Sequence, residues 1–400
     1  MFRQIIKGSL FIGFGKVADI FVVILTLPFL ITNIGVDNVG VINGSLALSM
    51  FFGSLVQYGF LLTGSRDIAG INEKKTQNEY VSTVLFVQVL FLFSGCILYF
   101  SIYNFFIFSR ENYLVCFIFC IAAMCRSIVP VYYFQGTGRF YVFPIINLIV
   151  KLLYIVLVYL IVEQDTAVEI VAYIFLLANF IMLLLSIIYM KSALKFRFVK
   201  PTVTNVIGKI KGSLDVFLIN FSPGIYNYSS IFILASYSDP VLFGVYSTAV
   251  RLVETCITVG NSVNEVALPV ISKTKNESKS NLIRVAGVVF GVVISACVFI
   301  FSDLVEFYIM PNVGGLSYYL KLLALWPIFI FIRNSYGING LIYNRLESTY
   351  RRIVISMSII GLVLMLIFVP LYSVMGAYYV LIFTAGTMAI LTYVFFKVKE

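Results

Sequence analysis

Three basic residues lie deep inside long apolar stretches of this chain. Arg126, Lys151 and Arg251 each stand about nine or ten residues from one end of such a stretch, or roughly 14 to 15 Å at about 1.5 Å of helical rise per residue. A bilayer core is about 30 Å thick, so the three charges fall near its middle. An ionised group there is costly unless it faces protein, water or a partner. Cations on three helices at one depth favour binding of a polyanion.

Seven further charged residues lie within the apolar stretches. They are Lys16, Asp19, Asp215, Glu254, Glu265, Lys321 and Arg333. Lys321 and Asp215 stand near stretch ends, where long side chains reach the interface. Lys16 with Asp19, and Arg251 with Glu254, have the i,i+3 spacing that places opposite charges on one helical face. Structural pairing within the helix is therefore an alternative for both pairs, whereas Arg126 and Lys151 have no acid at such spacing.

One apolar stretch carries a polar stripe along a single helical face. Its members step by three or four residues: Arg251, Glu254, Thr258, Asn261 and Glu265. Residues at this spacing share one side of a helix. In a membrane helix, such a side faces a water-filled cavity or polar neighbours. We therefore expect the stripe to line a central cavity.

Composition identifies the elements that must position these residues. The 400 residues are 61% hydrophobic and 12% charged, and the mean hydropathy is +1.01, far outside the range of soluble globular proteins. We expect an all-α membrane protein with about twelve transmembrane helices, each of roughly 20 apolar residues. The predicted spans are Leu10–Ile34, Gly40–Thr63, Val81–Ile107, Tyr113–Phe134, Val142–Val162, Val168–Met190, Ser213–Ser236, Val241–Pro269, Ile283–Tyr308, Tyr318–Ile342, Ile353–Leu371 and Gly376–Phe396.

Basic residues predict the orientation of these spans. Of the 28 Lys and Arg residues, 21 fall in one alternating set of connections and only Arg110 falls in the other. Cytoplasmic loops accumulate Lys and Arg, so we expect both termini in the cytoplasm. Membrane topology thus accounts for the net charge of +10, and nucleic acid is not an expected partner.

The longest basic connection divides the chain into two parts. We predict a six-helix lobe over residues 1–190, a basic linker over 191–212 and a second six-helix lobe over 213–400. A repeat supports the division, because residues 6–10 recur as residues 210–214 and Gly40-Val41 recurs as Gly244-Val245, both at an offset of 204. Lobes with even numbers of spans form a parallel pseudo-repeat, with the substrate path between them.

No metal or cofactor is expected. The six cysteines all lie inside apolar runs, and the chain has no histidine. Cysteines without paired spacing or histidine partners do not predict a zinc site or a disulfide framework. We interpret them as packing residues.

Three segments carry a resemblance to a known family. They are Tyr58–Ala69 (YGFLLTGSRDIA), Tyr132–Gly136 (YYFQG) and Gly244–Leu252 (GVYSTAVRL). Over nearly its full length the chain resembles the polysaccharide flippases of the Wzx type, which transport O antigen and belong to the multidrug/oligosaccharidyl-lipid/polysaccharide exporter superfamily. Tyr132 stands where that family usually has Trp, a mild departure from its pattern.

The resemblance implies a transporter and not an enzyme. It implies a cationic central cavity and movement of an undecaprenyl-diphosphate-linked sugar repeat unit across a bacterial inner membrane by alternating access. We expect Arg126, Lys151, Arg251, Lys16 and Arg333 to bind the diphosphate, with Asp19 and Glu254 as candidates for ion coupling. Expected partners are the bilayer, the lipid-linked glycan, a polysaccharide polymerase and a chain-length regulator.

Two other functions remain open. A drug or cation antiporter of the same superfamily would share the two lobes, but its cavity would favour acidic and apolar residues. Six cations against four acids inside the spans disfavour it. A membrane-bound glycosyltransferase or polymerase would need a large outer loop or a catalytic carboxylate motif, and no connection on the predicted outer side is longer than about a dozen residues.

Overall fold

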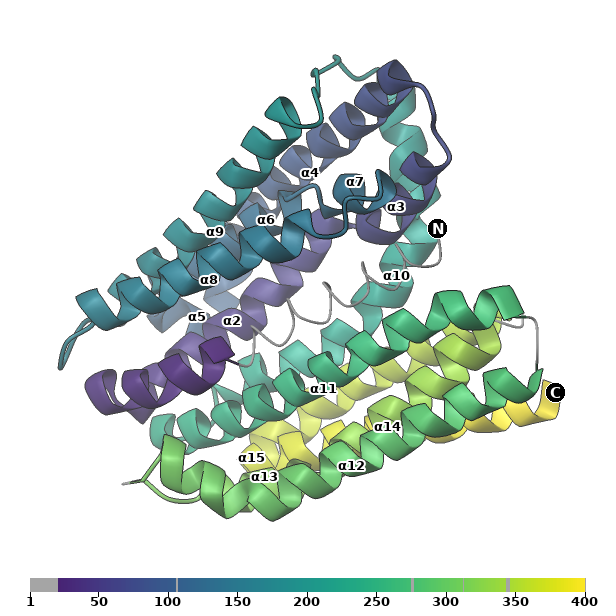
Figure 1. The fold of residues 1–400 in the computed structure, drawn as a ribbon. Coiled ribbons are helices and arrows are strands. Elements are labelled where there is room, and N and C mark those ends of the chain that lie inside the picture. The colour runs from purple at the N-terminus through teal and green to yellow at the C-terminus, as the bar shows by residue number, and fades with distance from the viewer. Residues whose placement is uncertain (1–20, 106, 275–276, 312, 343–345, 400) are drawn as a thin grey trace. The chain divides into compact units, whose positions relative to one another are not determined.

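The computed structural model describes residues 21–105, 107–274, 277–311, 313–342 and 346–399. Every regular element in these ranges is a helix (Figure 1). A chain that spans a membrane must satisfy its backbone hydrogen bonds internally, and helices do so within one segment. The prediction of an all-α membrane protein is confirmed.

Nine helical segments of the described chain are long and apolar enough to cross a bilayer. They are Val36–Ala69, Lys74–Phe105, Tyr113–Gly136, Val142–Ile161, Val168–Ser192, Pro240–Thr258, Arg284–Ile309, Leu316–Leu341 and Ser348–Val398, and the shorter apolar helix Phe21–Ile34 precedes them. Their length and mean hydropathy are sufficient for helices that span a bilayer. The count of twelve stays a prediction.

One long element contains two of the predicted spans. Element α15 (Glu347–Lys399) consists of two helices that meet at Ser373, whose φ of 51° and ψ of −129° are not helical. The two helices correspond to the predicted spans Ile353–Leu371 and Gly376–Phe396. Pro370 precedes the kink, and proline removes a helical hydrogen bond. A Cβ on Gly376 would lie 2.2 Å from the carbonyl oxygen of Phe368, so the bend requires glycine there.

The described chain forms two compact units. The boundaries between the units lie within α2 (Val36–Gln57) and within α10 (Val203–Leu234). Unit 1 comprises residues 44–224 and unit 2 comprises residues 21–43 and 225–399. The predicted domain boundaries at 190 and 213 stay a prediction.

Unit 1 is a bundle built on aromatic packing. Its further helices are α3 (Phe60–Ala69), α4 (Lys74–Ile102), the 3₁₀ turn η1 (Tyr103–Phe105), α5 (Ile107–Glu111), α6 (Tyr113–Ile128), α7 (Val131–Gly136), α8 (Val142–Ile161) and α9 (Val168–Ser192). Helix α9 packs along α6 and α8, and α3 packs on α7 (Figure 1). The buried core includes Phe60, Tyr132, Tyr133 and Phe134. Two of the segments that carry the family resemblance thus meet in this core.

Unit 2 contains the C-terminal helices. They are α11 (Pro240–Thr274), α12 (Glu277–Ile309), α13 (Leu316–Leu323), α14 (Leu325–Arg333), the π-helical segment η2 (Asn334–Ile342) and α15. Helix α14 packs between α12 and α15. Cβ atoms on Gly260 and Gly291 would lie 2.3 and 2.6 Å from Phe331, so these glycines admit its ring.

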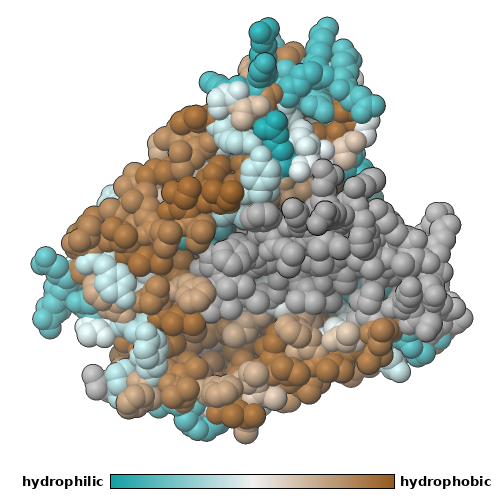
Figure 2. Space-filling model, viewed as in Figure 1, coloured by the Kyte–Doolittle hydropathy of each residue, from teal (hydrophilic) through white to brown (hydrophobic). Residues whose placement is uncertain are grey.

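Apolar side chains cover the outer faces of the helices. Leu160 is 73% exposed and Ile188 is 59% exposed, and Figure 2 shows brown residues over the bodies of α8 and α9 with teal residues at the ends. Large exposed apolar surfaces mark sites that a partner or a membrane covers. The pattern is that of a multi-pass membrane protein.

Candidate functional site

Helix α11 positions the central residue of the predicted site, and its start is encoded locally. The Asp239 carboxylate accepts hydrogen bonds from the backbone N–H groups of Val241 and Leu242 at 3.0 and 3.1 Å. Aspartate is a preferred N-cap, and Pro240 at the first helical position has the required φ. From this start, Arg251 lies on the fourth turn of the helix.

A buried amide orients Arg251. The Nη1 group of Arg251 donates to Asn43 Oδ1 at 2.9 Å, while Asn43 Nδ2 donates to Ser247 Oγ and Thr248 Oγ1, both at 3.2 Å. Asn43 is 4% exposed, and Ser247 and Thr248 are fully buried. We call these four residues the Asn43 cluster. Because the amide is neutral, its bond to Arg251 orients the guanidinium and adds no negative charge beside it.

Two glycines let α2 and α11 approach closely enough for this cluster to form. A Cβ on Gly40 would lie 3.0 Å from Cα of Gly244, and one on Gly244 would lie 2.2 Å from the carbonyl oxygen of Val36. Gly40 and Gly244 are separated by the repeat offset of 204 residues, and so are Asn43 and Ser247. Residues at the predicted repeat offset therefore contact each other here, and the repeat itself stays a prediction.

The remaining members of the stripe follow Arg251 along α11. Glu254 is half-buried and interacts electrostatically with Arg251, and Thr258 is exposed. Asn261 and Glu265 lie on the same helix, but their side chains are outside the described part of the structure. The cavity that the stripe is predicted to line stays a prediction.

The two nominated cations of unit 1 lie on different helices, which both pack against α9. Lys151 is on α8 and is 9% exposed. Arg126 is in the last turn of α6 and is half-buried. Arg333 belongs to unit 2, where its Nε and Nη2 donate to Asn334 Oδ1 at 3.2 and 3.1 Å. Lys16 and Asp19 lie outside the described residues.

At the helix break next to Arg126, a backbone carbonyl group accepts a hydrogen bond from a side chain that the sequence analysis did not identify. Helix α6 ends at Ile128 and α7 begins after Pro130, which cannot donate a backbone hydrogen bond. Gln88 on α4 donates from Nε2 to the carbonyl oxygen of Ser127 at 2.8 Å, and Gln88 is 1% exposed. The only signal in the sequence was a glutamine inside an apolar span.

A second polar cluster forms in unit 1 within the first family segment. Asp67 Oδ2 accepts from the Tyr80 hydroxyl at 3.0 Å and lies 3.8 Å from Lys209 Nζ, while Arg66 donates to Asp67 Oδ1 at 3.2 Å. Lys209 Nζ also lies 3.7 Å from the centre of the Tyr80 ring. Burial lowers the pKa of Lys209, and the Asp67 carboxylate opposes that shift. We call these four residues the Asp67 cluster.

The start of α10 docks beside the Asp67 cluster. Thr63 and Ser213 hydroxyls are 2.8 Å apart, and Gly59 precedes α3 with a φ of 75°. A Cβ on Gly59 would lie 3.0 Å from the backbone nitrogen of Phe217. Both the positive φ and the close approach of α10 therefore require glycine at this position.

Solved structures of transporters share this fold. The lipid II flippase MurJ in an inward closed conformation matches with a TM-score of 0.74 and 16% identity, covering 99% of this chain and 88% of that one. An inward-facing multidrug resistance transporter of the MATE family and MOP superfamily matches with a TM-score of 0.64 and 13% identity, covering 100% and 93%. At these identities the likeness is one of fold.

Curated relatives and a family pattern extend the comparison to sequence. Proteins named "Putative O-antigen transporter" from Escherichia coli (strain K12) and Shigella dysenteriae are each 22% identical, covering 88% and 90% of this chain and 87% and 92% of their own lengths. The pattern of the polysaccharide biosynthesis protein family matches residues 5–275. This match includes α2, the Asp67 cluster and the whole Asn43 cluster, and the chain belongs to that family.

Proposed function

We propose that this protein is a flippase for lipid-linked oligosaccharides. Its cargo would be an undecaprenyl-diphosphate-linked repeat unit of O antigen or a similar surface polysaccharide. Membership of the polysaccharide biosynthesis protein family, relatives named for O-antigen transport and a fold shared with the lipid II flippase MurJ support this proposal.

The observation that carries the proposal is the anchored guanidinium of Arg251. A cation inside an apolar span is energetically costly and therefore indicates a functional site. The hydrogen-bond partner of Arg251, Asn43, is neutral and buried. Arginine presents five N–H donors in a planar fork that matches phosphate oxygens. Arg251 oriented in this way would bind the diphosphate, the group hardest to carry through hydrocarbon. Lys16, Arg126, Lys151 and Arg333 would supply further positive charge.

Transport would proceed by alternating access. Two six-helix lobes, residues 1–190 and 213–400 joined by the basic linker 191–212, would rock about a site at mid-membrane depth. The glycan would occupy the hydrated cleft while the prenyl chain stays in lipid. Asp19 and Glu254 would couple the cycle to an ion gradient. Desolvation favours the protonated form of a carboxyl group and a neighbouring cation favours the ionised form, so a change in either one during the cycle can change its protonation.

The setting is a bacterial inner membrane with both termini in the cytoplasm. The excess of Lys and Arg in alternate connections supports this orientation. The polysaccharide polymerase and the chain-length regulator that use the flipped unit would be its partners.

The second candidate is a drug or cation antiporter of the same superfamily. The matching MATE structures support it at the level of fold. More than five residues from either end of a predicted span, five basic residues (Lys16, Arg126, Lys151, Arg251 and Arg333) stand against two acidic ones (Asp19 and Glu254), which favours an anionic cargo. Drug-resistance assays of the expressed protein separate the two, because an antiporter confers resistance and a flippase does not.

A complementation experiment tests the flippase. Arg126, Lys151 and Arg251 are replaced singly by Gln in a strain that lacks its own flippase, and surface polysaccharide is measured at native expression. Arg110→Gln is the matched control, since Arg110 is exposed on α5. We expect the control to restore polysaccharide and the Arg251 variant to fail. Full restoration by all three variants would refute the proposal.

A further inference from the structure

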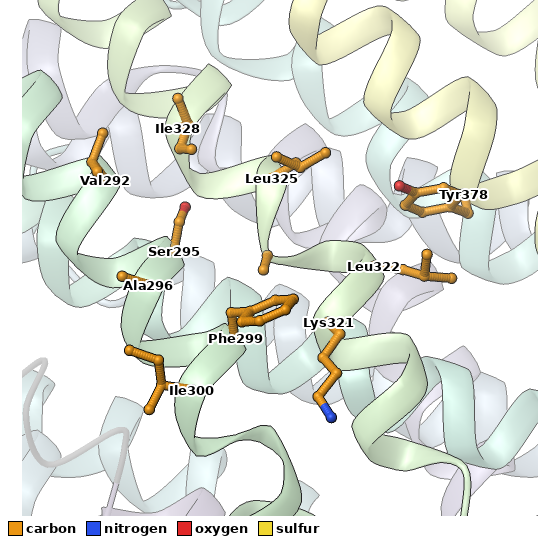
Figure 3. Close-up of a pocket in the computed structure, with 11 residues that line it drawn as sticks. Val292, Ser295, Ala296, Phe299, Ile300, Lys321, Leu322, Leu325, Ile328 and Tyr378 are labelled. Atoms are coloured by element: carbon orange, nitrogen blue, oxygen red, sulfur yellow. The ribbon is translucent and has the colours of Figure 1, made fainter.

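An apolar groove lies on the surface of unit 2. The groove encloses about 550 Å³ between α12, α13, α14 and α15. Helix α12 contributes Val292, Phe299 and Ile300, and α14 contributes Leu325 and Ile328 (Figure 3). Lys321 and Tyr378 complete the wall from α13 and α15.

The groove opens on the most exposed span of the described chain. Only 22% of the apolar window in Arg284–Ile309 is buried, the lowest share among the nine candidate spans. Val292 is 47% exposed, Phe299 54% and Ile300 68%. In a membrane, apolar side chains with this exposure face acyl chains, so hydrocarbon has direct access to the groove.

An ion pair stands at one end of the groove. Lys321 Nζ lies 2.8 and 3.0 Å from the two carboxylate oxygens of Asp303, and Ser317 also donates to that carboxylate. The side chain of Asp303 is 72% exposed and that of Lys321 is 38% exposed. Figure 3 shows the Lys321 ammonium pointing away from Val292 and Ile328, at the opposite end.

The length of the groove matches one leaflet. Eleven residues of α12 separate Asp303 from Val292, which is about 16 Å of helix at roughly 1.5 Å per residue. Half of a bilayer core of about 30 Å is about 15 Å. A lipid with its head group at the ion pair would therefore lay one acyl chain along the groove as far as the middle of the membrane.

The charge pair selects the head group. We propose that the groove binds a zwitterionic phospholipid with a primary ammonium group, its phosphate on Lys321 and its ammonium on Asp303. Charge-assisted hydrogen bonds favour both contacts. A choline head group has no N–H donor for Asp303, and a glycerol head group leaves that carboxylate beside a second negative charge. The site does not depend on what the protein transports.

Lipid retention tests the proposal. The full chain is placed in nanodiscs with equal parts of phosphatidylethanolamine, phosphatidylglycerol and phosphatidylcholine, and retained lipids are counted by native mass spectrometry. We expect one phosphatidylethanolamine molecule, retained about tenfold over each of the others, because hydrogen bonds to charged groups discriminate on this scale. Equal retention of the three lipids, or preference for another one, overturns the proposal.

Two variants locate the bound lipid. Lys321→Gln removes the phosphate contact and Ala296→Phe fills the exposed groove wall, and each should lower phosphatidylethanolamine retention about tenfold. Leu304→Phe is the control, because Leu304 is 63% exposed on α12 and outside the groove. Elution as a single species in detergent checks folding of each protein. Wild-type retention in either folded groove variant overturns the assignment.

Discussion

The two polar clusters hold a cation in opposite ways. In the Asp67 cluster, one carboxylate contacts both Lys209 and Arg66 and accepts from Tyr80, so the direct partner of each cation is a carboxylate, and the side chains are partly exposed. In the Asn43 cluster, a neutral amide orients Arg251 among fully buried hydroxyl groups. A carboxylate bonded directly to a cation suits a structural contact, whereas a neutral amide that orients a cation suits a binding site. The two clusters therefore differ in the chemistry of the group that holds the cation.

The largest effect on stability is expected at the contact of α2 with α11, next to the Asn43 cluster. Gly244→Val places a side chain 2.2 Å from the Val36 carbonyl oxygen, and overpacking of this severity costs about 3 kcal/mol. We expect a lower thermal midpoint in detergent and a low yield of folded protein. Gly208→Ala is the control, because nothing lies within 4 Å of its Cβ position and alanine favours the helix by about 1 kcal/mol. Equal midpoints for both variants would contradict the close contact of α2 and α11.

Loss of the orienting amide should have the next largest effect. Asn43→Leu leaves Arg251 without this acceptor, and hydrogen bonds to charged groups contribute about 1.5 to 3 kcal/mol. We expect surface polysaccharide in the complementation assay to fall at least tenfold.

Asn43→Asp provides the sharper version of this test. The substitution keeps the acceptor in place but gives Arg251 a carboxylate partner, as in the Asp67 cluster. We expect a folded protein with reduced transport, because a carboxylate in addition to Glu254 then opposes the guanidinium charge. Full transport by Asn43→Asp would show that orientation alone matters and would remove the contrast between the clusters.

A smaller effect is expected at Gln88 in unit 1. Gln88→Leu leaves the Ser127 carbonyl unsatisfied at the helix break, a cost of about 1 to 3 kcal/mol. We expect a lower thermal midpoint, with polysaccharide per folded molecule maintained. A loss of transport at an unchanged midpoint would place the break beside Arg126 in the binding machinery.

The smallest effect is expected at the Asp67 cluster. Asp67→Asn weakens ion pairs that are partly exposed, and such pairs contribute about 0 to 1 kcal/mol. We expect a small decrease in thermal midpoint that disappears at high salt, because exposed charges are screened. A decrease as large as that of Asn43→Leu would mean that the clusters are equivalent.

Most of the fold was predictable because apolar length and charge placement act locally. The spans at Tyr113–Gly136, Val142–Ile161 and Val168–Ser192 agree with their predicted bounds within a few residues. The kink at Ser373 separates the last two predicted spans within α15, and Pro370 was its local signal. Among the candidate site residues, Arg251, Glu254 and Thr258 lie on one helix, α11, as helical periodicity predicted, and the role of the polar stripe stays a prediction.

The hydrogen-bond partners of Arg251 and of the Ser127 carbonyl group could not be predicted from the sequence. Asn43 and Arg251 are 208 residues apart, and Gln88 and Ser127 are 39 residues apart. Nothing in local propensity distinguishes these amides from other polar residues in apolar spans. The repeat at an offset of 204 relates Asn43 to Ser247, but it did not predict that equivalent residues would touch.

By itself, the sequence determined an all-helical membrane protein with cations inside its apolar helices. Hydropathy and helical periodicity depend on residues within a few turns along the sequence, so both can be predicted from it. Only the tertiary structure decided which cation is hydrogen-bonded to a neutral amide and which is hydrogen-bonded to a carboxylate. That choice depends on atoms brought within about 3 Å by packing, through glycines such as Gly40 and Gly244 whose missing side chains permit the approach.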